Sequence, residues 1–483
     1  MRSAGILMPI ASLPSDYGIG DFGKYSYQFI DMLKKSKVAI WQILPLNPLG
    51  YGNSPYQPYS SYAGDELYIA LDALETDGLV EKAEPFQKKS SQIDYEGVRE
   101  YKRTYLLEAF QNFVPSKQYE EFIKADWVYE YGVFLALKKQ NDLICWNEWP
   151  DEQKNWIIDK KYDLTPLKEN IEYEMFLQFL FFDQWMKLKK YANDRDIQIM
   201  GDIPFYVGID SQDVWANQKC FLLDADSKPT FVAGVPPDYF SATGQRWGNP
   251  IYDWNYLKET NFELWVDRLA YCDKMFDIVR IDHFRAFDTY WSIPSSCDTA
   301  IQGEWLEAPG FDLFDVIHKE IPHIQIVVED LGDLREEVHV LRDHYNFKGM
   351  KVLQFAFDPN ETNNDFEDRE NMIIYTGTHD NQTIRDWYRS RTRTEKKNIR
   401  RALKELGYAE GPVSWKFIQM AFHSVGEMAI IPTQDFINIG DEGRINTPGT
   451  LGSPNWEWKL SDLNKFEKRI GMIRHLIEET KVK

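Results

Sequence analysis

Short apolar runs that end on an acidic residue recur along the chain. Three of them, QIMGD, FDIVRID and IQIVVE, end on Asp202, Asp282 and Glu329, and a fourth, MIIYTGTHD, reaches Asp380. In a parallel barrel, side chains at the carboxyl ends of the strands meet at one face of the molecule. We therefore expect these four carboxylates to lie near one another.

Alternation along the second run sorts its side chains onto two faces. Successive residues of a strand point to opposite sides, so Arg280 and Asp282 share one face while Val279 and Ile281 share the other. In the third run, Glu329 shares a face with Val327 in the same way. We expect the polar face to form a site and the apolar face to pack.

Eight apolar runs along the chain are candidate strands, the number that a closed (β/α)8 barrel requires. Helix-like stretches at 25–34, 175–190 and 334–344 lie between them, and this alternation favours a parallel sheet. The predicted fold class is α/β, a (β/α)8 TIM barrel. The candidate strands are 4–8, 39–44, 198–203, 277–281, 324–328, 352–355, 372–375 and 428–431.

Two of the gaps between these runs are too long for simple connections. The first, 50–170, opens with a Tyr/Pro/Ser/Gly loop and continues into charged amphipathic sequence, which predicts a mainly helical insertion. The second, 208–262, is too rich in Gly, Pro and aromatics for regular structure and too apolar for disorder. It predicts an ordered loop subdomain over the C-terminal face of the barrel. We expect one catalytic domain, 1–483, that carries both insertions.

Composition narrows the classes of function. The formal net charge of −21 disfavours nucleic acid and anionic lipid as partners, because both would be repelled at long range. No run is long enough for a membrane span, and Pro9 and Pro14 interrupt the apolar N-terminus, so we expect a cytoplasmic protein. The four cysteines are isolated, which favours neither disulfides nor a zinc site. Aromatic residues make up 15% of the chain, which suits a sugar-binding cleft.

The acids at the strand ends suit glycosidic bond cleavage with retention, which needs one ionised carboxylate and one protonated carboxyl group. Arg280 would favour the ionised form of Asp282, which makes Asp282 the candidate nucleophile. Partial desolvation would raise the pKa of Glu329 and make it the candidate acid/base. Asp380 would stabilise a cationic transition state, with His379 beside it as a ligand of sugar hydroxyls.

Each acid taken alone is also explained by a purely structural role. A carboxylate at a strand end is often a helix cap or one half of a loop salt bridge. All four acids together, with Arg280, His283 and His379 adjacent, favour a site over four unrelated structural contacts.

The motifs around these acids resemble those of a known family. In sequence and order they are similar to the motifs of amylomaltases, the 4-alpha-glucanotransferases of glycoside hydrolase family 77 in the alpha-amylase clan. The similarity runs almost end to end. The motifs are SLPSDYGIGDFG, GNSPYQPYSSYAGD, GDIPFYV, FVAGVPPDYFSATGQRWGNPIYDW, VRIDHFR, YWSIPSSCDTAIQGEWLEAPG, VEDLG, YTGTHDNQT, QDFINIGDEGRINTPGT and NWEWKL.

The resemblance assigns roles to residues. It implies that Asp282 is the nucleophile, Glu329 the general acid/base and Asp380 the stabiliser of the transition state. Arg246 stands where the family more often carries an apolar residue, which leaves the acceptor side of its loop open. The implied substrate contacts are Asn53, Ser54, Tyr56, Asp202, Asp238, Tyr239, Phe240, Gln245, Trp247, Asn249, Arg280, His283, His379, Asn446 and Pro448.

The implied activity moves a segment of an alpha-1,4-glucan from a donor maltodextrin to the 4-hydroxyl of glucose or another maltodextrin. It requires no cofactor and no metal, and we expect a monomer or weak homodimer. A retaining hydrolase of the same clan is the alternative, because residue spacing does not say whether water or sugar captures the intermediate. A catalytically silent glucan-binding protein would have aromatic clefts without the complete acid set.

Overall fold

Eight parallel strands form the centre of the molecule. The computed structural model describes residues 2–87, 90–237, 241–332, 334–357 and 369–480. The sheet order is β10-β11-β12-β1-β2-β3-β6-β9, and each neighbouring pair is parallel. The strands are β1 (Ser3–Leu7), β2 (Ile40–Gln42), β3 (Gln198–Pro204), β6 (Ile278–Asp282), β9 (Ile326–Val328), β10 (Gly349–Val352), β11 (Met372–Tyr375) and β12 (Met428–Pro432).

The two ends of this sheet meet and close a barrel. Val327 forms a parallel bridge with Lys348, the residue before β10, and the Val328 N–H donates to the Lys348 carbonyl at 2.9 Å. The predicted (β/α)8 barrel is confirmed. Its strands are almost wholly buried on both sides, because side chains fill the barrel and helices cover it.

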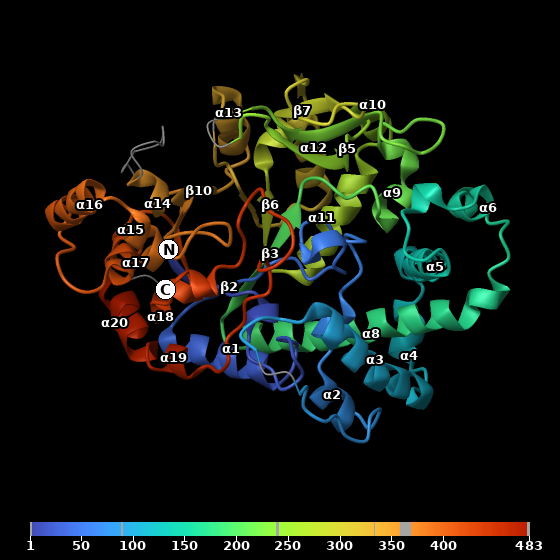
Figure 1. Ribbon diagram of the computed structural model, residues 1–483, viewed down its shortest axis with the longest axis horizontal. Coiled ribbons are helices and arrows are strands. Elements are labelled where there is room, and N and C mark those ends of the chain that lie inside the picture. The colour runs from blue at the N-terminus through green and yellow to red at the C-terminus, as the bar shows by residue number, and fades with distance from the viewer. Residues whose placement is uncertain (1, 88–89, 238–240, 333, 358–368, 481–483) are drawn as a thin grey trace.

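Helices surround the barrel, and Figure 1 shows α8 running along one side with α15, α16, α17 and α20 at the opposite end. The stretches predicted at 25–34 and 175–190 lie within α1 and α8, and that at 334–344 overlaps α13. The surrounding helices are α1 (Lys24–Ser36), α8 (Lys168–Asn193), α11 (Glu263–Met275), α12 (Gly310–Glu320), α13 (Glu336–His344), α15 (Ile384–Ser390), α16 (Arg393–Glu405), α17 (Val413–His423), α19 (Asn464–Glu467) and α20 (Ile470–Thr480). None of the described helices combines the length and apolarity that crossing a membrane requires.

One predicted strand was placed wrongly. The expected run 352–355 overlaps β10 only at Val352, because Leu353–Ala356 form the short helix α14. Strand and helical turn are both buried here. A short, largely apolar run does not show whether the chain continues as a strand or turns into a helix, so the sequence did not reveal the end of β10.

The segment between β2 and β3 is mainly helical, and Figure 1 shows its helices gathered on one side of the barrel. Its longest helices before α8 are α3 and α5, and α5 packs along α8. The helices before α8 are α2 (Leu71–Thr76), α3 (Tyr95–Asn112), α4 (Lys117–Phe122), α5 (Asp126–Gln140), α6 (Asp151–Lys154) and α7 (Trp156–Asp159).

The 208–262 segment was expected to lack regular structure, and that expectation was wrong. It contains α9 (Gln212–Ala216), α10 (Trp254–Glu259) and the strands β4 (Phe231–Val235) and β5 (Gln245–Pro250). These strands join β7 (Thr289–Pro294) and β8 (Glu304–Glu307) in an antiparallel sheet of order β5-β4-β7-β8. β4 pairs with β5 inside the insertion and with β7 outside it, so the composition of the insertion alone did not reveal the whole sheet.

Candidate active site

The predicted acids lie at the carboxyl ends of barrel strands. Asp202 is in the last part of β3, Asp282 ends β6, Glu329 directly follows β9, and Asp380 is in the turn after β11. In the register of β3 and β6, Asp202 is opposite Arg280 and Pro204 is opposite Asp282. Parallel pairing thus carries these side chains to the same end of the barrel.

Arg280 links two of the acids. Its Nη1 donates to both carboxylate oxygens of Asp202 at 2.7 Å, and its Nη2 lies 2.9 Å from Asp282 Oδ1. Arg280 and Asp202 are almost wholly buried, whereas the Asp282 side chain is 32% exposed. The predicted sharing of one strand face by Arg280 and Asp282 is confirmed. The arginine holds Asp282 in place and leaves part of its carboxylate accessible.

Tyr56 completes the surroundings of Asp202. Its hydroxyl donates to Asp202 Oδ2 at 2.8 Å. Burial raises the pKa of Asp202, although the charge of Arg280 opposes that shift. Burial and the neighbouring carboxylate of Asp202 also raise the pKa of Tyr56, so the phenol stays protonated and keeps donating.

Glu329 has a different electrostatic environment from Asp282. Burial, reinforced by the negative charge of Asp282, raises the pKa of Glu329 to about 8, while Arg280 opposes the shift. The carboxyl group accepts the N–H of His283 at 2.9 Å and that of Leu331 at 3.0 Å. At neutral pH it is therefore mostly protonated and oriented by two backbone donors.

His283 holds an uncommon backbone conformation at this point. Its φ of 57° lies in the left-handed region, and this conformation accompanies the donation of its N–H to Glu329. Burial lowers the pKa of the imidazole to about 4. His283 is therefore neutral near pH 7 and offers one donor and one acceptor to a ligand.

His379 and Asp380 form the opposite part of the site. His379 is 4% exposed, and its Nε2 is 3.5 Å from Asp380 Oδ1. The Asn446 side chain donates to the same oxygen at 2.7 Å, and its backbone N–H donates to the His379 carbonyl at 3.1 Å. The His379 ring stacks on Tyr56, with centroids 5.1 Å apart and planes 15° apart. Tyr56 therefore joins the Asp380 side to the Asp202 side.

The β5 strand brings an aromatic residue to His283. The Trp247 ring meets the His283 ring edge-on at 5.0 Å, and its Nε1 donates to Gln245 Oε1 at 3.2 Å. Asn249 is buried and donates to the Val207 carbonyl at 2.9 Å. Arg246, between Gln245 and Trp247 in sequence, instead donates to the Ser295 carbonyl at 3.2 Å. By strand alternation it faces away from the side that carries Trp247.

Other predicted contacts are placed less closely. Ser54 Oγ accepts the Tyr56 N–H at 3.3 Å, Asn53 has a φ of 56°, and Pro448 is exposed. Among the contacts recorded for the described ranges, none joins the side chains of these three residues to the acids. Asp238, Tyr239 and Phe240 lie outside the described residues.

Several neighbours of the site were not predicted. Trp456 packs against both Tyr56 and His379, and Tyr206 packs against Trp247 at 6.1 Å and His283 at 6.1 Å. Tyr375 donates to Gln42 Oε1 at 2.8 Å; burial raises the pKa of Tyr375, and Arg280 opposes this shift while Asp202 adds to it. Tyr375 and Gln42 each end a barrel strand, a signal that could have marked them. Trp456 lies in the NWEWKL motif, but nothing in the motif assigned it a place in the site.

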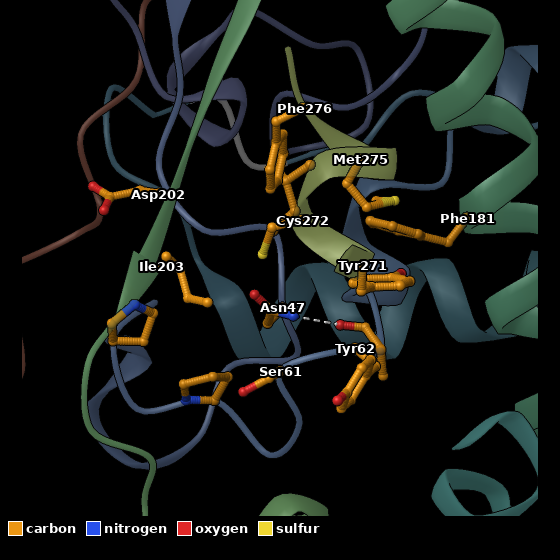
Figure 2. Close-up of a pocket in the computed structure, with 14 residues that line it drawn as sticks. Asn47, Ser61, Tyr62, Phe181, Asp202, Ile203, Tyr271, Cys272, Met275 and Phe276 are labelled. Carbon is orange, nitrogen blue, oxygen red and sulfur yellow. Dashed lines mark hydrogen bonds between the residues drawn. The ribbon is translucent and has the colours of Figure 1, made fainter. Parts of the chain in front are cut away.

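A small cavity lies between β3 and α11, on the side of Asp202 away from its carboxylate. Figure 2 shows the Asp202 carboxylate directed away from Cys272, Tyr271, Met275 and Phe276, which line the other side. The cavity measures about 20 Å³, which is room for about one water molecule and not for a sugar ring. Within the part of the chain that the structure describes, no group of three His, Cys, Asp or Glu residues is arranged to hold a metal ion.

Comparisons with known proteins identify the family of the chain. A family model described as 4-alpha-glucanotransferase matches residues 8–464. The chain is 44% identical over 472 residues to a 4-alpha-glucanotransferase of Clostridium butyricum, covering 94% of this chain and 96% of that protein. It is 38% identical to a chloroplastic/amyloplastic 4-alpha-glucanotransferase of Solanum tuberosum, covering 96% of this chain and 83% of that one.

A solved structure extends the similarity to three dimensions. The amylomaltase of Streptococcus agalactiae, solved in complex with acarbose, superimposes with a TM-score of 0.94 at 35% identity. The superposition covers 100% of both chains. With relatives this similar over nearly the whole length, the chain belongs to the 4-alpha-glucanotransferase family and is an enzyme of that class.

Proposed function

We propose that Asp282, Glu329 and Asp380 carry out the transfer of alpha-1,4-glucan segments by a retaining double displacement. The observation that carries this proposal is the pair of neighbouring carboxyl groups in opposite environments. Asp282 is held by Arg280 at 2.9 Å, whereas the pKa of Glu329 is raised to about 8. A retaining mechanism needs one carboxylate and one carboxylic acid in this relation.

In the first step, Asp282 attacks the anomeric carbon of the donor while Glu329 transfers its proton to the glycosidic oxygen. The bond between C1 and that oxygen breaks, and the fragment on the reducing-end side leaves with a free 4-hydroxyl. The remaining segment stays on Asp282 as a glycosyl ester.

The electrostatics then change in the direction that the second step needs. Ester formation removes the negative charge of Asp282, one of the causes that raise the pKa of Glu329. The pKa of Glu329 therefore falls, and the carboxylate accepts the proton of an incoming 4-hydroxyl. That hydroxyl attacks C1, breaks the ester and forms a new alpha-1,4 bond with net retention.

The remaining polar groups would bind the glucosyl unit at C1. Asp380 would stabilise positive charge that develops on the sugar ring, and its contacts with Asn446 and His379 fix its position. Tyr56, Asp202, Arg280, His283 and His379 would orient the sugar hydroxyls. Trp247 would stack on the acceptor or donor chain beside His283.

Hydrolysis differs from transfer only in the molecule that captures the ester. Family membership favours transfer over the hydrolase alternative. Trp247 of β5, beside His283, would support transfer by keeping water from the ester while an acceptor binds. The partners are thus an alpha-1,4-glucan donor and a glucose or maltodextrin acceptor.

Maltotriose as the sole substrate tests the proposal. We expect chromatography to show glucose together with a ladder of maltodextrins longer than maltotriose. The Asp282→Asn variant, assayed in parallel, serves as the control for a contaminating activity. Formation of glucose and maltose alone would show a hydrolase and contradict the proposal.

A further inference from the structure

We propose that Trp456 is a positioning residue of the active site, which fixes the rings of Tyr56 and His379 for the bound glucosyl unit. The inference rests on the proposed function, in which both rings contact sugar. Trp456 lies in the C-terminal segment, far from either ring in sequence.

The three rings form one cluster. The Trp456 ring centroid is 5.8 Å from that of Tyr56 and 5.9 Å from that of His379, and the latter two stack on each other at 5.1 Å. The interplanar angles of Trp456 to these rings are 48° and 39°. The indole therefore packs against both members of the stack and restricts the tilt of each.

The polar atoms of the two rings act on different acids. The Tyr56 hydroxyl donates to Asp202 at 2.8 Å, and His379 Nε2 lies 3.5 Å from Asp380 Oδ1. A rotation of either ring would move its polar atom relative to its acid. The indole, which itself has no recorded contact with an acid among the described residues, can thus affect both sides of the site through these rings.

The backbone of Trp456 is also tied to the site. Its N–H donates to the Ile445 carbonyl at 2.7 Å, directly before Asn446, which donates to Asp380 at 2.7 Å. Its carbonyl accepts the hydroxyl of Tyr95, on α3 of the helical segment, at 2.7 Å. The N–H and the carbonyl of Trp456 are therefore held by two different segments, one of them far away in sequence.

Trp456 holds a left-handed backbone conformation, with φ at 68°. Such a conformation is unusual for a bulky aromatic residue and persists only where the surroundings fix it. Here it places the indole against the Tyr56–His379 stack while the N–H and carbonyl of Trp456 bond to Ile445 and Tyr95. A residue that only filled space would not need this combination of strained backbone and two-sided contact.

The test compares Trp456→Ala and Trp456→Phe by steady-state kinetics on maltotriose, with melting temperatures measured alongside. We expect Trp456→Ala to lower kcat by about tenfold or more with KM changed by less than about threefold. Displaced Tyr56 and His379 side chains would mainly weaken binding of the transition state. Trp456→Phe retains a ring and should restore kcat to within about threefold of the wild type.

Trp458→Phe is the matched control, since Trp458 is buried two residues away and its carbonyl accepts from Ser12 instead. We expect it to lower the melting temperature without lowering kcat. If Trp456→Ala does not fold, Trp456→Leu keeps apolar volume without a ring and should show the same loss of kcat. Tyr95→Phe, which removes only the bond to the Trp456 carbonyl, should lower kcat slightly in the same direction.

The inference is wrong if folded Trp456→Ala or Trp456→Leu keeps kcat within twofold of the wild type. It is equally wrong if Phe and Ala lower kcat alike. These results would leave the transferase proposal intact, provided that the wild type makes the maltodextrin ladder. A wild type that releases only glucose and maltose would overturn the transferase proposal, while glucose release would still report the effect of Trp456 on kcat.

Discussion

Two buried clusters in this molecule each pair a cationic side chain with a carboxylate, and they differ in whether a carboxylate stays accessible to solvent. In the active-site cluster, Arg280 contacts both Asp202 and Asp282, and the Asp282 side chain remains 32% exposed. In the other cluster, Lys102 of α3 contacts Asp21 at 3.2 Å and the carbonyls of Leu67 and Ile69 at 2.6 and 2.8 Å. There the lysine is fully buried and the Asp21 side chain is 8% exposed.

Burial shifts the carboxyl groups of both clusters in the same direction. It raises the pKa of Asp21 to about 6 and also raises that of Asp202, in each case against the attraction of a neighbouring cation. A raised pKa therefore does not by itself mark a reactive group. The difference lies in Asp282, which one arginine orients but which solvent or substrate can still reach. The Lys102 cluster uses its polar atoms to anchor the helical segment.

The largest expected effect comes from Asp282→Asn. It should keep the fold but lower kcat by at least about three decades, roughly 4 kcal/mol of lost barrier reduction, because the amide cannot form the ester. Steady-state kinetics and circular dichroism measure the two quantities. Asp277→Asn, at the other end of β6, is the matched control and should retain kcat. Near-normal transfer by Asp282→Asn would remove Asp282 from the nucleophile role.

Glu329→Gln should lower kcat by two to three decades, within the range typical of a lost general acid. Wild-type kcat/KM should fall as pH rises through about 8, because Glu329 then loses the proton that it must donate. The variant should lack this alkaline decline. An unchanged pH profile in the variant would assign the decline to another group.

The same shift predicts a stability difference with a defined sign. Because the folded-state pKa of Glu329 is raised, its protonated form favours folding below the ordinary carboxyl pKa, and this contribution is lost as pH rises through about 8. The melting temperature of the wild type relative to Glu329→Gln should therefore decrease from pH 5 to pH 9. The opposite slope would contradict the burial of this carboxyl group.

Lys102→Met tests whether the Lys102–Asp21 cluster serves stability and not catalysis. Leaving Asp21 without its cation should cost about 3 kcal/mol of unfolding free energy, with kcat of the folded protein within twofold of the wild type. Urea unfolding and kinetics at low temperature measure these effects. The double variant Lys102→Met/Asp21→Asn should recover part of the stability. A large loss of kcat without a loss of stability would show that this cluster acts in the reaction.

Trp247→Ala should have the smallest effect, about a tenfold decrease in kcat/KM, consistent with one lost aromatic contact of about 1.4 kcal/mol. Its melting temperature should change little, because the ring is only partly buried beside His283. Trp305→Ala, on β8 of the same small sheet, is the control and should keep kcat/KM. A large drop in melting temperature with normal activity would make Trp247 a packing residue.

Much of the barrel and part of the site could be predicted from local pattern. Met372–Tyr375 has the predicted bounds, and most other barrel strands differ from theirs by one or two residues. The pairing of Arg280 with Asp282 followed from alternation within a single strand. The boundary at Val352 and the antiparallel sheet of β4 and β5 did not follow. In the first case two buried elements adjoin. In the second, β4 pairs with β5 inside the insertion, but the sheet is completed by β7 and β8, which belong to a later segment.

The sequence by itself determined which residues end the strands and which of them share a face, because apolar runs and two-residue alternation are properties of neighbouring positions. Only the tertiary structure decided that Arg280 would also hold Asp202, that Tyr56 would stack on His379, and that Trp456 would pack against both. Those contacts join residues far apart along the chain. They form only when the barrel closes and brings the segments together, so no local preference of any one segment specifies them.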